Sequence, residues 1–479
     1  MLFNSLEFAV FFPLVVGIYF LLPQRHRVLW LLVSSCVFYM AFIPVYIFIL
    51  FVTILIDYVA GIYIEKMQGR ARMALLWVSI ISTCSVLFVF KYFGFFTSNI
   101  NGLAGLLGLH PPMPVLEIIL PIGLSFHTFQ SLSYVIEVYR GRQKAEPHFI
   151  TYATYVMFFP QLVAGPIERP QHLLHQFWEH HVFDYERVTS GLKRMAWGLF
   201  KKLVVADRLA LYVNDVYAAP QNFNGLQLTL ATVFFAYQIY CDFSGYSDIA
   251  IGTARVLGFR LMENFDTPYY SRSISEFWHR WHISLSTWFR DYVYIPMGGS
   301  RVAKSRWFFN LMVTFAVSGL WHGANWTYVV WGALNGFYLV MGVATKGLRD
   351  RVFGLVGLND KTLLRKAIMI ASTFFLTSIG WVVFRAKTMA DAWYVMTHFA
   401  SGWDFGRIGT EQFLLRQLPA AVAGIMVLEI GQLLQGKVSI PSVLGRLPMT
   451  PRWALYASFV MAVLMFGIYR KTQFIYFQF

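Results

Sequence analysis

Charged residues are scarce in this chain of 479 residues. They make up 13% of the sequence, whereas a soluble domain carries about 25%. Hydrophobic residues account for 57%, and apolar stretches long enough to span a bilayer recur along the chain. The composition excludes an ordinary soluble protein and predicts an all-α polytopic membrane protein.

Cysteine is also rare. Cys36, Cys84 and Cys241 lie in apolar stretches without the spacing of a metal or redox motif, so we expect them to be core residues. The first seven residues lack the positively charged region of a signal peptide. The first apolar segment is therefore expected to be retained as a membrane span.

Acidic residues are fewer than basic ones, which gives a net charge of +15. Nucleic-acid binding is one explanation, but basic residues also gather in the cytoplasmic loops of membrane proteins. Loops 23–27, 65–73 and 139–148 carry Lys or Arg, whereas the alternate loops, around Pro44 and from 94 to 114, carry none. This pattern favours the lipid bilayer over nucleic acid as a partner and predicts an extracytoplasmic N-terminus.

Apolar stretches predict about ten to twelve membrane crossings, at ~20 residues each. The chain, 1–479, is expected to be a single membrane domain with a charged, aromatic-rich amphipathic segment at 259–306 on the cytoplasmic side. The predicted spans are roughly 6–22, 28–43, 45–64, 74–93, 115–138, 149–165, 192–213, 226–256, 308–345, 365–384, 415–435 and 453–469.

One uncharged run, residues 307–345, contains a single histidine, His322. As one straight helix, 39 residues would extend roughly 58 Å, about twice the ~30 Å thickness of a hydrocarbon core. The run must therefore form two spans or one bent element, and Gly319, Gly323 and Asn325 are natural places for a break.

An ionisable residue at membrane depth is costly and usually serves a function. Irregular backbone at that depth is tolerated where it is buried in protein or lines a cavity. We therefore predict that His322 faces a polar interior pocket. The structural alternative is a packing histidine bonded to a backbone carbonyl.

A second cluster is WHRWH at 278–282. His279 and His282 are three residues apart, which predicts one helical face, and Glu276 precedes them at the same spacing. Such a set can bind a metal. Alternatively, the segment is an amphipathic helix whose basic residues hold an anionic phosphate-bearing donor; these are Arg272, Arg280, Arg290, Arg301, Lys304 and Arg306.

A third cluster, DFSGYSD at 242–248, places Asp242, Ser244 and Asp248 inside an apolar span. Buried carboxylates should be paired. They could orient a histidine, coordinate an ion, or pair with Arg255 or Arg260, and a structural role is slightly favoured. Asp57, in another span, is at least as well explained by helix pairing as by catalysis.

Other histidines could suggest a membrane di-iron oxygenase; they are His172, His175, His180 and His181. Their spacing lacks the dense histidine boxes of such a site, and segment 166–187 is polar, which is typical of surface histidines. No metal site is expected.

Together these motifs resemble the membrane-bound O-acyltransferase superfamily, and within it the bacterial branch that acetylates polysaccharides such as alginate, peptidoglycan and cellulose. The likeness runs from Met1 to at least Arg385. It is densest at LPIGLSF (120–126), SYVIEVYRG (133–141), DFSGYSD (242–248), ENF (263–265), SEFWHRWHISLSTWFRDY (275–292) and GLWHGA (319–324).

The resemblance implies a helical bundle with a central tunnel in the bacterial inner membrane. It implies that His322 is the catalytic base and His282 the second site residue, with His279 incidental. His282 or Asn325 could donate to the oxyanion of the tetrahedral intermediate. The other expected residues are Trp278, Arg280, Trp288, Arg290, Trp321 and Asn325 for donor or acceptor binding, and Asp242, Ser244 and Asp248 as polar support.

The implied reaction uses acetyl-CoA from the cytoplasm as the acyl donor, with no bound cofactor. An extracytoplasmic acetyltransferase partner, or the polysaccharide itself, would receive the acetyl group. A transporter or flippase for an acyl group or polysaccharide precursor would also use broken helices and buried ionisable groups, but the sequence shows no inverted repeat. A scaffold for polysaccharide export would leave His322 without a role.

Overall fold

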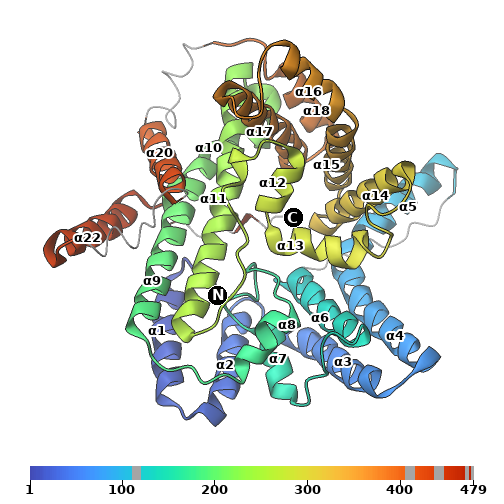
Figure 1. Ribbon diagram of the computed structural model, residues 1–479, viewed down its shortest axis with the longest axis vertical. Helices are drawn as coiled ribbons and strands as arrows, with labels where there is room; N and C mark the ends of the chain where they lie inside the picture. Colours follow the sequence, from blue (N-terminus) through green and yellow to red (C-terminus); the bar gives the residue numbers. More distant parts are fainter. Residues whose placement is uncertain (110–119, 405–415, 436–446, 470–473, 476–479) are drawn as a thin grey trace. The chain divides into compact units, whose positions relative to one another are not determined.

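In the computed structural model, the described residues form helices joined by loops and turns, which confirms the all-α prediction (Figure 1). The structure describes residues 1–109, 120–404, 416–435, 447–469 and 474–475. Within these ranges there is no strand. The helices form two compact units, the first from residues 1–195 and 247–263 and the second from residues 196–246 and 264–479. The single membrane domain stays a prediction.

Most of the first unit comes from the N-terminal helices, and the C-terminal end of α11 completes it. Ser5 begins the first helix, because its hydroxyl accepts a hydrogen bond from the backbone N–H of Phe8. The helices are α1 (Leu6–Leu21), α2 (Gln24–Met40), α3 (Tyr46–Lys66), α4 (Gly69–Leu87), η1 (Phe88–Tyr92), α5 (Phe93–Leu106), α6 (Leu124–Tyr139), α7 (Phe149–Met157), α8 (Pro170–Leu173), η2 (Leu174–Phe177) and α9 (Tyr185–Leu199).

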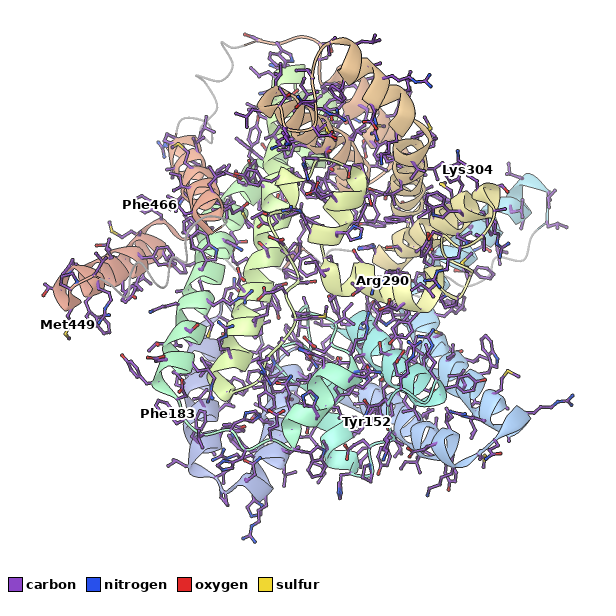
Figure 2. All side chains as sticks on the ribbon, in the orientation of Figure 1. Tyr152, Phe183, Arg290, Lys304, Met449 and Phe466 are labelled. Carbon is purple, nitrogen blue, oxygen red and sulfur yellow. The ribbon has the colours of Figure 1, made fainter. Side chains whose placement is uncertain are left out.

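The second unit holds His282 and His322. Figure 2 labels Arg290 and Lys304, between which the chain connects α13 to α14, and Met449 and Phe466, the ends of α22. The elements are η3 (Phe200–Ala206), α10 (Asp207–Ala218), η4 (Pro220–Asn222), α11 (Gly225–Leu257), η5 (Pro268–Tyr270), α12 (Ile274–Arg280), α13 (Ile283–Phe289), η6 (Arg290–Tyr294), α14 (Lys304–His322), α15 (Trp326–Ala344), α16 (Lys346–Leu355), α17 (Leu363–Arg385), α18 (Met389–His398), α20 (Leu418–Gln435) and α22 (Met449–Phe466).

Apolar helices of spanning length make this a multi-pass membrane protein. Among the described residues, five helices are long and apolar enough to cross a bilayer: Tyr46–Lys66, Gly69–Leu106, Trp326–Ala344, Leu363–Arg385 and Met449–Phe466. Two shorter apolar helices are Leu6–Leu21 and Leu418–Leu434. The predicted total of ten to twelve crossings stays a prediction.

Two stretches differ from their predicted form. The expected span 149–165 forms a helix only as far as Met157, because the chain then turns at Phe158. The expected loop 94–114 is helical through Leu106, and its residues from 110 lie outside the described ranges.

The uncharged run forms two helices, as predicted. Helix α14 ends at His322 and α15 begins at Trp326. Gly323 between them is extended, and a Cβ atom there would lie 2.2 Å from the ring of Tyr328. Asn325 begins α15, because its side-chain oxygen accepts a hydrogen bond from the N–H of Thr327 at 3.0 Å. The break places His322 at a helix end.

Two glycines allow α14 and α15 to pack closely. A Cβ atom on Gly319 would lie 2.2 Å from the carbonyl oxygen of Tyr328 and 2.9 Å from the Cα of Gly332. No side chain fits at those distances without displacing backbone. Because His322 follows Gly319 by less than one helical turn, this helix crossing fixes the position of the imidazole.

Replacing Gly319 by alanine is expected to lower stability by about 1–3 kcal/mol, the usual cost of forcing a methyl group into a packed contact. Gly342 on α15 has nothing within 4 Å of a built Cβ atom, so Gly342→Ala is the matched control. Thermal unfolding in detergent measures both variants. Equal melting temperatures for the two variants would contradict the close crossing.

Candidate active site

His322 is buried against aromatic rings at the end of α14. Its Nδ1 lies 2.6 Å from the backbone carbonyl oxygen of Ser318. A carbonyl oxygen can only accept, so Nδ1 carries the hydrogen and Nε2 is the basic nitrogen of the neutral ring. The imidazole contacts Trp331 of α15 and Phe384 of α17, with ring centroids 4.9 and 5.9 Å away. The hydrogen bond to a backbone carbonyl that a packing histidine would make is therefore present. It uses Nδ1 only, so Nε2 can still act as a base.

His282 is the residue that immediately precedes α13, and it is 1% exposed. Its backbone lies in the left-handed region, with φ 44° and ψ 53°, a conformation that costs a non-glycine residue about 1–3 kcal/mol. Its Nδ1 is 3.1 Å from Oδ1 of Asn264. The edge of its ring faces Phe243 of α11 at 4.6 Å.

The predicted shared face of His279 and His282 is wrong. Helix α12 ends at Arg280, and the left-handed turn at His282 separates it from α13. His279 is exposed and bonds the carbonyl oxygen of Ser275, whereas His282 is buried. A spacing of three residues places side chains together only within a continuous helix, and this helix is interrupted.

The two histidines are close enough to interact electrostatically. Burial holds the pKa of His282 well below its usual value, and the charge of His322 acts in the same direction. Because a buried imidazole loses the hydration of its charged form, His282 is neutral at pH 7. Two neighbouring imidazoles in one apolar surrounding can hold one proton between them but resist holding two.

Aromatic rings connect the surroundings of the two histidines. Trp331, which contacts His322, stacks on Trp381 at 5.9 Å, and Trp381 lies 5.0 Å from Trp281. Trp281 is next to His282 in sequence. This apolar frame strengthens electrostatic interactions within it, because its effective dielectric constant is lower than that of water.

Of the predicted binding residues, Trp278 lies nearest to this frame. Its ring is 5.8 Å from that of Trp331. Arg280 forms an ion pair with Glu276 at 2.9 Å, and the exposed Arg290 forms one with Asp291 at 2.8 Å. Both ion pairs are formed within the segment that carries His282, so each guanidinium group is held near its own backbone.

The remaining predicted binding residues have different surroundings. Trp288 of α13 is buried against Tyr292 at 4.9 Å. Trp321 precedes His322 and is half-buried. Asn325 is exposed and its side-chain oxygen caps α15, which occupies the oxygen. Its role towards substrate stays a prediction.

Asp242 belongs to a buried ionic cluster in the second unit. Nζ of Lys202 lies 2.5 Å from Asp242 and 2.9 Å from Asp207. The proposed pairing of Asp242 with Arg255 or Arg260 is wrong, because the lysine comes from the π-helical turn η3 beside α11. Near this cluster in sequence, Ser244 is 2% exposed.

Asp248 is paired within the first unit. Arg194 of α9 lies 3.0 Å from Asp248 and also binds Glu263. These two carboxylates raise the pKa of Arg194 despite its burial. The predicted pairing of Asp248 with Arg255 or Arg260 is wrong here too, since Arg255 bonds Ser190. The arrangement supports a structural role for Asp248.

A C-terminal segment contacts the same face of α11 that holds Phe243. The N–H of Ile475 donates to Oδ2 of Asp242 at 2.7 Å. Phe474 contacts Phe243 at 5.8 Å and Tyr246 at 4.7 Å, and both Phe474 and Ile475 are almost fully buried. The ring that faces His282 is thereby supported from another side.

The described residues contain no group of three or more His, Cys, Asp or Glu side chains that could hold a metal ion. The absence of a di-iron site stays a prediction. His172 instead bonds the buried Glu168 at 2.6 Å, and this hydrogen bond raises the pKa of His172. His181 bonds the carbonyl oxygen of Gln176.

Several residues of the site were not assigned from the sequence. Asn264 lies in the ENF motif (263–265), and the only sequence indication of its role was that this motif is close to WHRWH (278–282) in the chain. Trp331, Trp381 and Phe384 gave no signal, because aromatic residues in apolar helices are common and their packing partners are set by tertiary structure. Lys202 is one of two adjacent lysines in the predicted span 192–213, and the sequence did not indicate which of them would pair with a carboxylate.

Comparison with protein-family models gives one match. Residues 140–380 match the model of the membrane-bound O-acyltransferase family. The match includes His282, His322, Trp281 and Trp331. Trp381 and Phe384 lie just beyond its end.

Curated proteins with similar sequences extend the comparison. The chain is 38% identical to the probable alginate O-acetylase AlgI of Pseudomonas aeruginosa, over 89% of this chain and 80% of that protein. It is 32% identical to the peptidoglycan O-acetyltransferase of Helicobacter pylori, over 77% and 72%. It is 27% identical to the teichoic acid D-alanyltransferase of Bacillus subtilis, over 58% and 71%.

Proposed function

This chain belongs to the membrane-bound O-acyltransferase family, and from its paired histidines we propose that it moves an acetyl group from cytoplasmic acetyl-CoA to a polysaccharide outside the inner membrane. The chain is an acyltransferase and a multi-pass membrane protein. The observation that carries the proposal is the neutral-ring geometry of His322, which directs its hydrogen to Ser318 and leaves Nε2 basic.

In the proposed reaction, Nε2 of His322 takes the proton of an acceptor hydroxyl as the oxygen attacks the thioester carbonyl carbon. The tetrahedral intermediate collapses, the carbon–sulfur bond breaks, and the CoA sulfur takes the proton back from the imidazolium. The products are an acetyl ester and free CoA thiol. His282, beside His322, supports this proton transfer.

The donor is proposed to enter beside α12 and α13. The exposed Arg290 and half-buried Arg280 belong to this segment, and guanidinium groups bind phosphates in a bidentate manner. Trp278, Trp288 and Trp321 would line the path of the acyl chain. The basic residues within 259–306 support a cytoplasmic location for this segment, and the basic loops 23–27, 65–73 and 139–148 support an extracytoplasmic N-terminus.

The acceptor is proposed to be an exported polysaccharide of the alginate type, delivered alone or through an extracytoplasmic acetyltransferase partner. The support is the higher identity to the probable alginate O-acetylase, 38%, than to the teichoic acid D-alanyltransferase, 27%. The same comparison favours acetyl over D-alanyl as the transferred group.

Reconstituted protein with labelled acetyl-CoA on one side and alginate oligosaccharide on the other tests this proposal. We expect free CoA thiol on the donor side and labelled ester on the oligosaccharide, with acetyl-CoA accepted only on the side that exposes loop 65–73. A transporter would instead move label across without releasing thiol. That result, or transfer from the opposite side only, would overturn the proposed reaction or its direction.

A further inference from the structure

We propose that Asn264 is a positioning residue that holds His282 in the tautomer with hydrogen on Nδ1, so that Nε2 of His282 accepts a proton or hydrogen bond during acyl transfer. The inference rests on the proposed function for its catalytic meaning. The tautomer assigned to His282 depends only on the contacts of Asn264 and not on the proposed function.

Three contacts converge on Oδ1 of Asn264. The backbone N–H of Ser284 donates to it at 3.2 Å and the Ser284 hydroxyl at 2.9 Å. A backbone N–H can only donate, so the amide of Asn264 must present its oxygen here. Nδ1 of His282, 3.1 Å from that oxygen, faces an acceptor and therefore carries the hydrogen. In the neutral ring, Nε2 then has the lone pair.

Asn264 also holds the backbone that follows His282. Its carbonyl oxygen accepts the N–H of Ile283 at 2.9 Å. Together with the Ser284 bonds, this fixes the first turn of α13 against residue 264. A left-handed backbone at a non-glycine residue persists only where surrounding contacts hold it in place. Buried Asn264, 1% exposed, supplies these contacts at His282.

The tautomer decides what His282 can do. A neutral ring with hydrogen on Nδ1 offers no donor at Nε2, so neutral His282 cannot donate from Nε2 to the oxyanion of a tetrahedral intermediate. His322 has the same tautomer, and two basic nitrogens cannot bond each other directly. In the proposed reaction the acceptor hydroxyl donates its single hydrogen to Nε2 of His322, and the basic Nε2 of His282 then accepts a hydrogen bond from the resulting imidazolium. The pair therefore matches a hydroxyl-bearing acceptor.

Titratable neighbours set the pH dependence. The His282 ring contacts Phe243 of α11 and Phe265 before α12, and its Nδ1 lies 3.1 Å from Asn264. The charge of His322, at the end of α14, acts on it electrostatically. Of these, His322 is titratable and lowers the pKa of His282, as does burial. The acidic limb that belongs to His282 should therefore lie below the usual imidazole pKa of about 6.5.

Asn264→Asp and Asn264→Leu separate positioning from packing. Aspartate keeps the acceptor oxygen but adds a negative charge beside Nδ1, which raises the pKa of His282. The acidic limb of the kcat/KM profile should move to higher pH by about 1–3 units, with activity retained above it. Leucine removes the acceptor, and kcat should fall about 10- to 100-fold, as when partners that orient an imidazole are lost, with an unchanged KM for acetyl-CoA.

Ser284→Ala is the matched control, because it removes a hydrogen bond to the same Oδ1 without a contact to the His282 ring, and it should keep the wild-type pH profile. Nitrogen-15 NMR of labelled histidine reports the His282 tautomer without any substrate. Hydrogen on Nε2 in the wild type, or an unshifted acidic limb in Asn264→Asp, would overturn the inference. If His282 carries hydrogen on Nδ1 but the protein does not cleave acetyl-CoA, the proposed function is wrong and the tautomer assignment still holds.

Discussion

Replacing His322 by alanine is expected to reduce acetyl transfer by about 10²–10⁴-fold, the contribution of a positioned general base. The variant loses the basic nitrogen that Ser318 orients. Substrate binding away from the imidazole is untouched, so the KM for acetyl-CoA should change little while kcat falls. Release of CoA thiol in proteoliposomes measures both constants.

The control for this variant is His398→Ala. His398 is an exposed histidine of α18 in the same unit, and its removal should leave kcat at the wild-type value. Size-exclusion profiles and melting temperatures establish that both variants are folded. Full activity of folded His322→Ala protein would rule out this residue as the base.

Replacing Lys202 by methionine is expected to cost about 3–5 kcal/mol, because removing one partner from a buried ionic cluster leaves uncompensated charge. Lys202 lies between two carboxylates, Asp207 and Asp242, and all three side chains are at most 6% exposed. Methionine has a similar length to lysine and is apolar, so the loss of stability should come mainly from the lost charge and not from lost packing. Thermal unfolding in detergent measures the effect.

Lys346→Met makes the same chemical change at an exposed position and should be nearly neutral. Combining Lys202→Met with Asp207→Asn and Asp242→Asn removes the excess negative charge and should restore much of the lost stability, since whole buried ionic groups can often be replaced at little cost. A single Lys202→Met variant as stable as the exposed control would show that the cluster is not energetically coupled.

A break or bend in the run 307–345 was predictable from its length, and Gly323 was one of three residues named as places for it. An uncharged run twice as long as a bilayer core must turn, and glycine beside a capping asparagine indicates where. The all-α class and the membrane location follow from composition in the same way. These features depend on local sequence and on the bilayer as a solvent, so they need no knowledge of which helices meet.

The errors concern residues whose position depends on tertiary contacts. Helical spacing placed His279 beside His282, but the left-handed turn that separates them is held by Asn264, eighteen residues upstream in sequence. Pairing with Arg255 or Arg260 was one alternative for Asp242, yet its lysine partner comes from another helix. Sequence spacing indicates neighbours along one helix and gives no information on partners across helices.

The hydrogen bond from Ile475 to Asp242 joins residues 233 positions apart. During synthesis α11 forms before residue 475 exists, so the Asp242 carboxylate first meets Lys202 without this donor. Contacts between such distant residues form late, because a long loop must close first. We therefore expect Phe474 and Ile475 to reach Phe243 and Asp242 only after α11 is already in place.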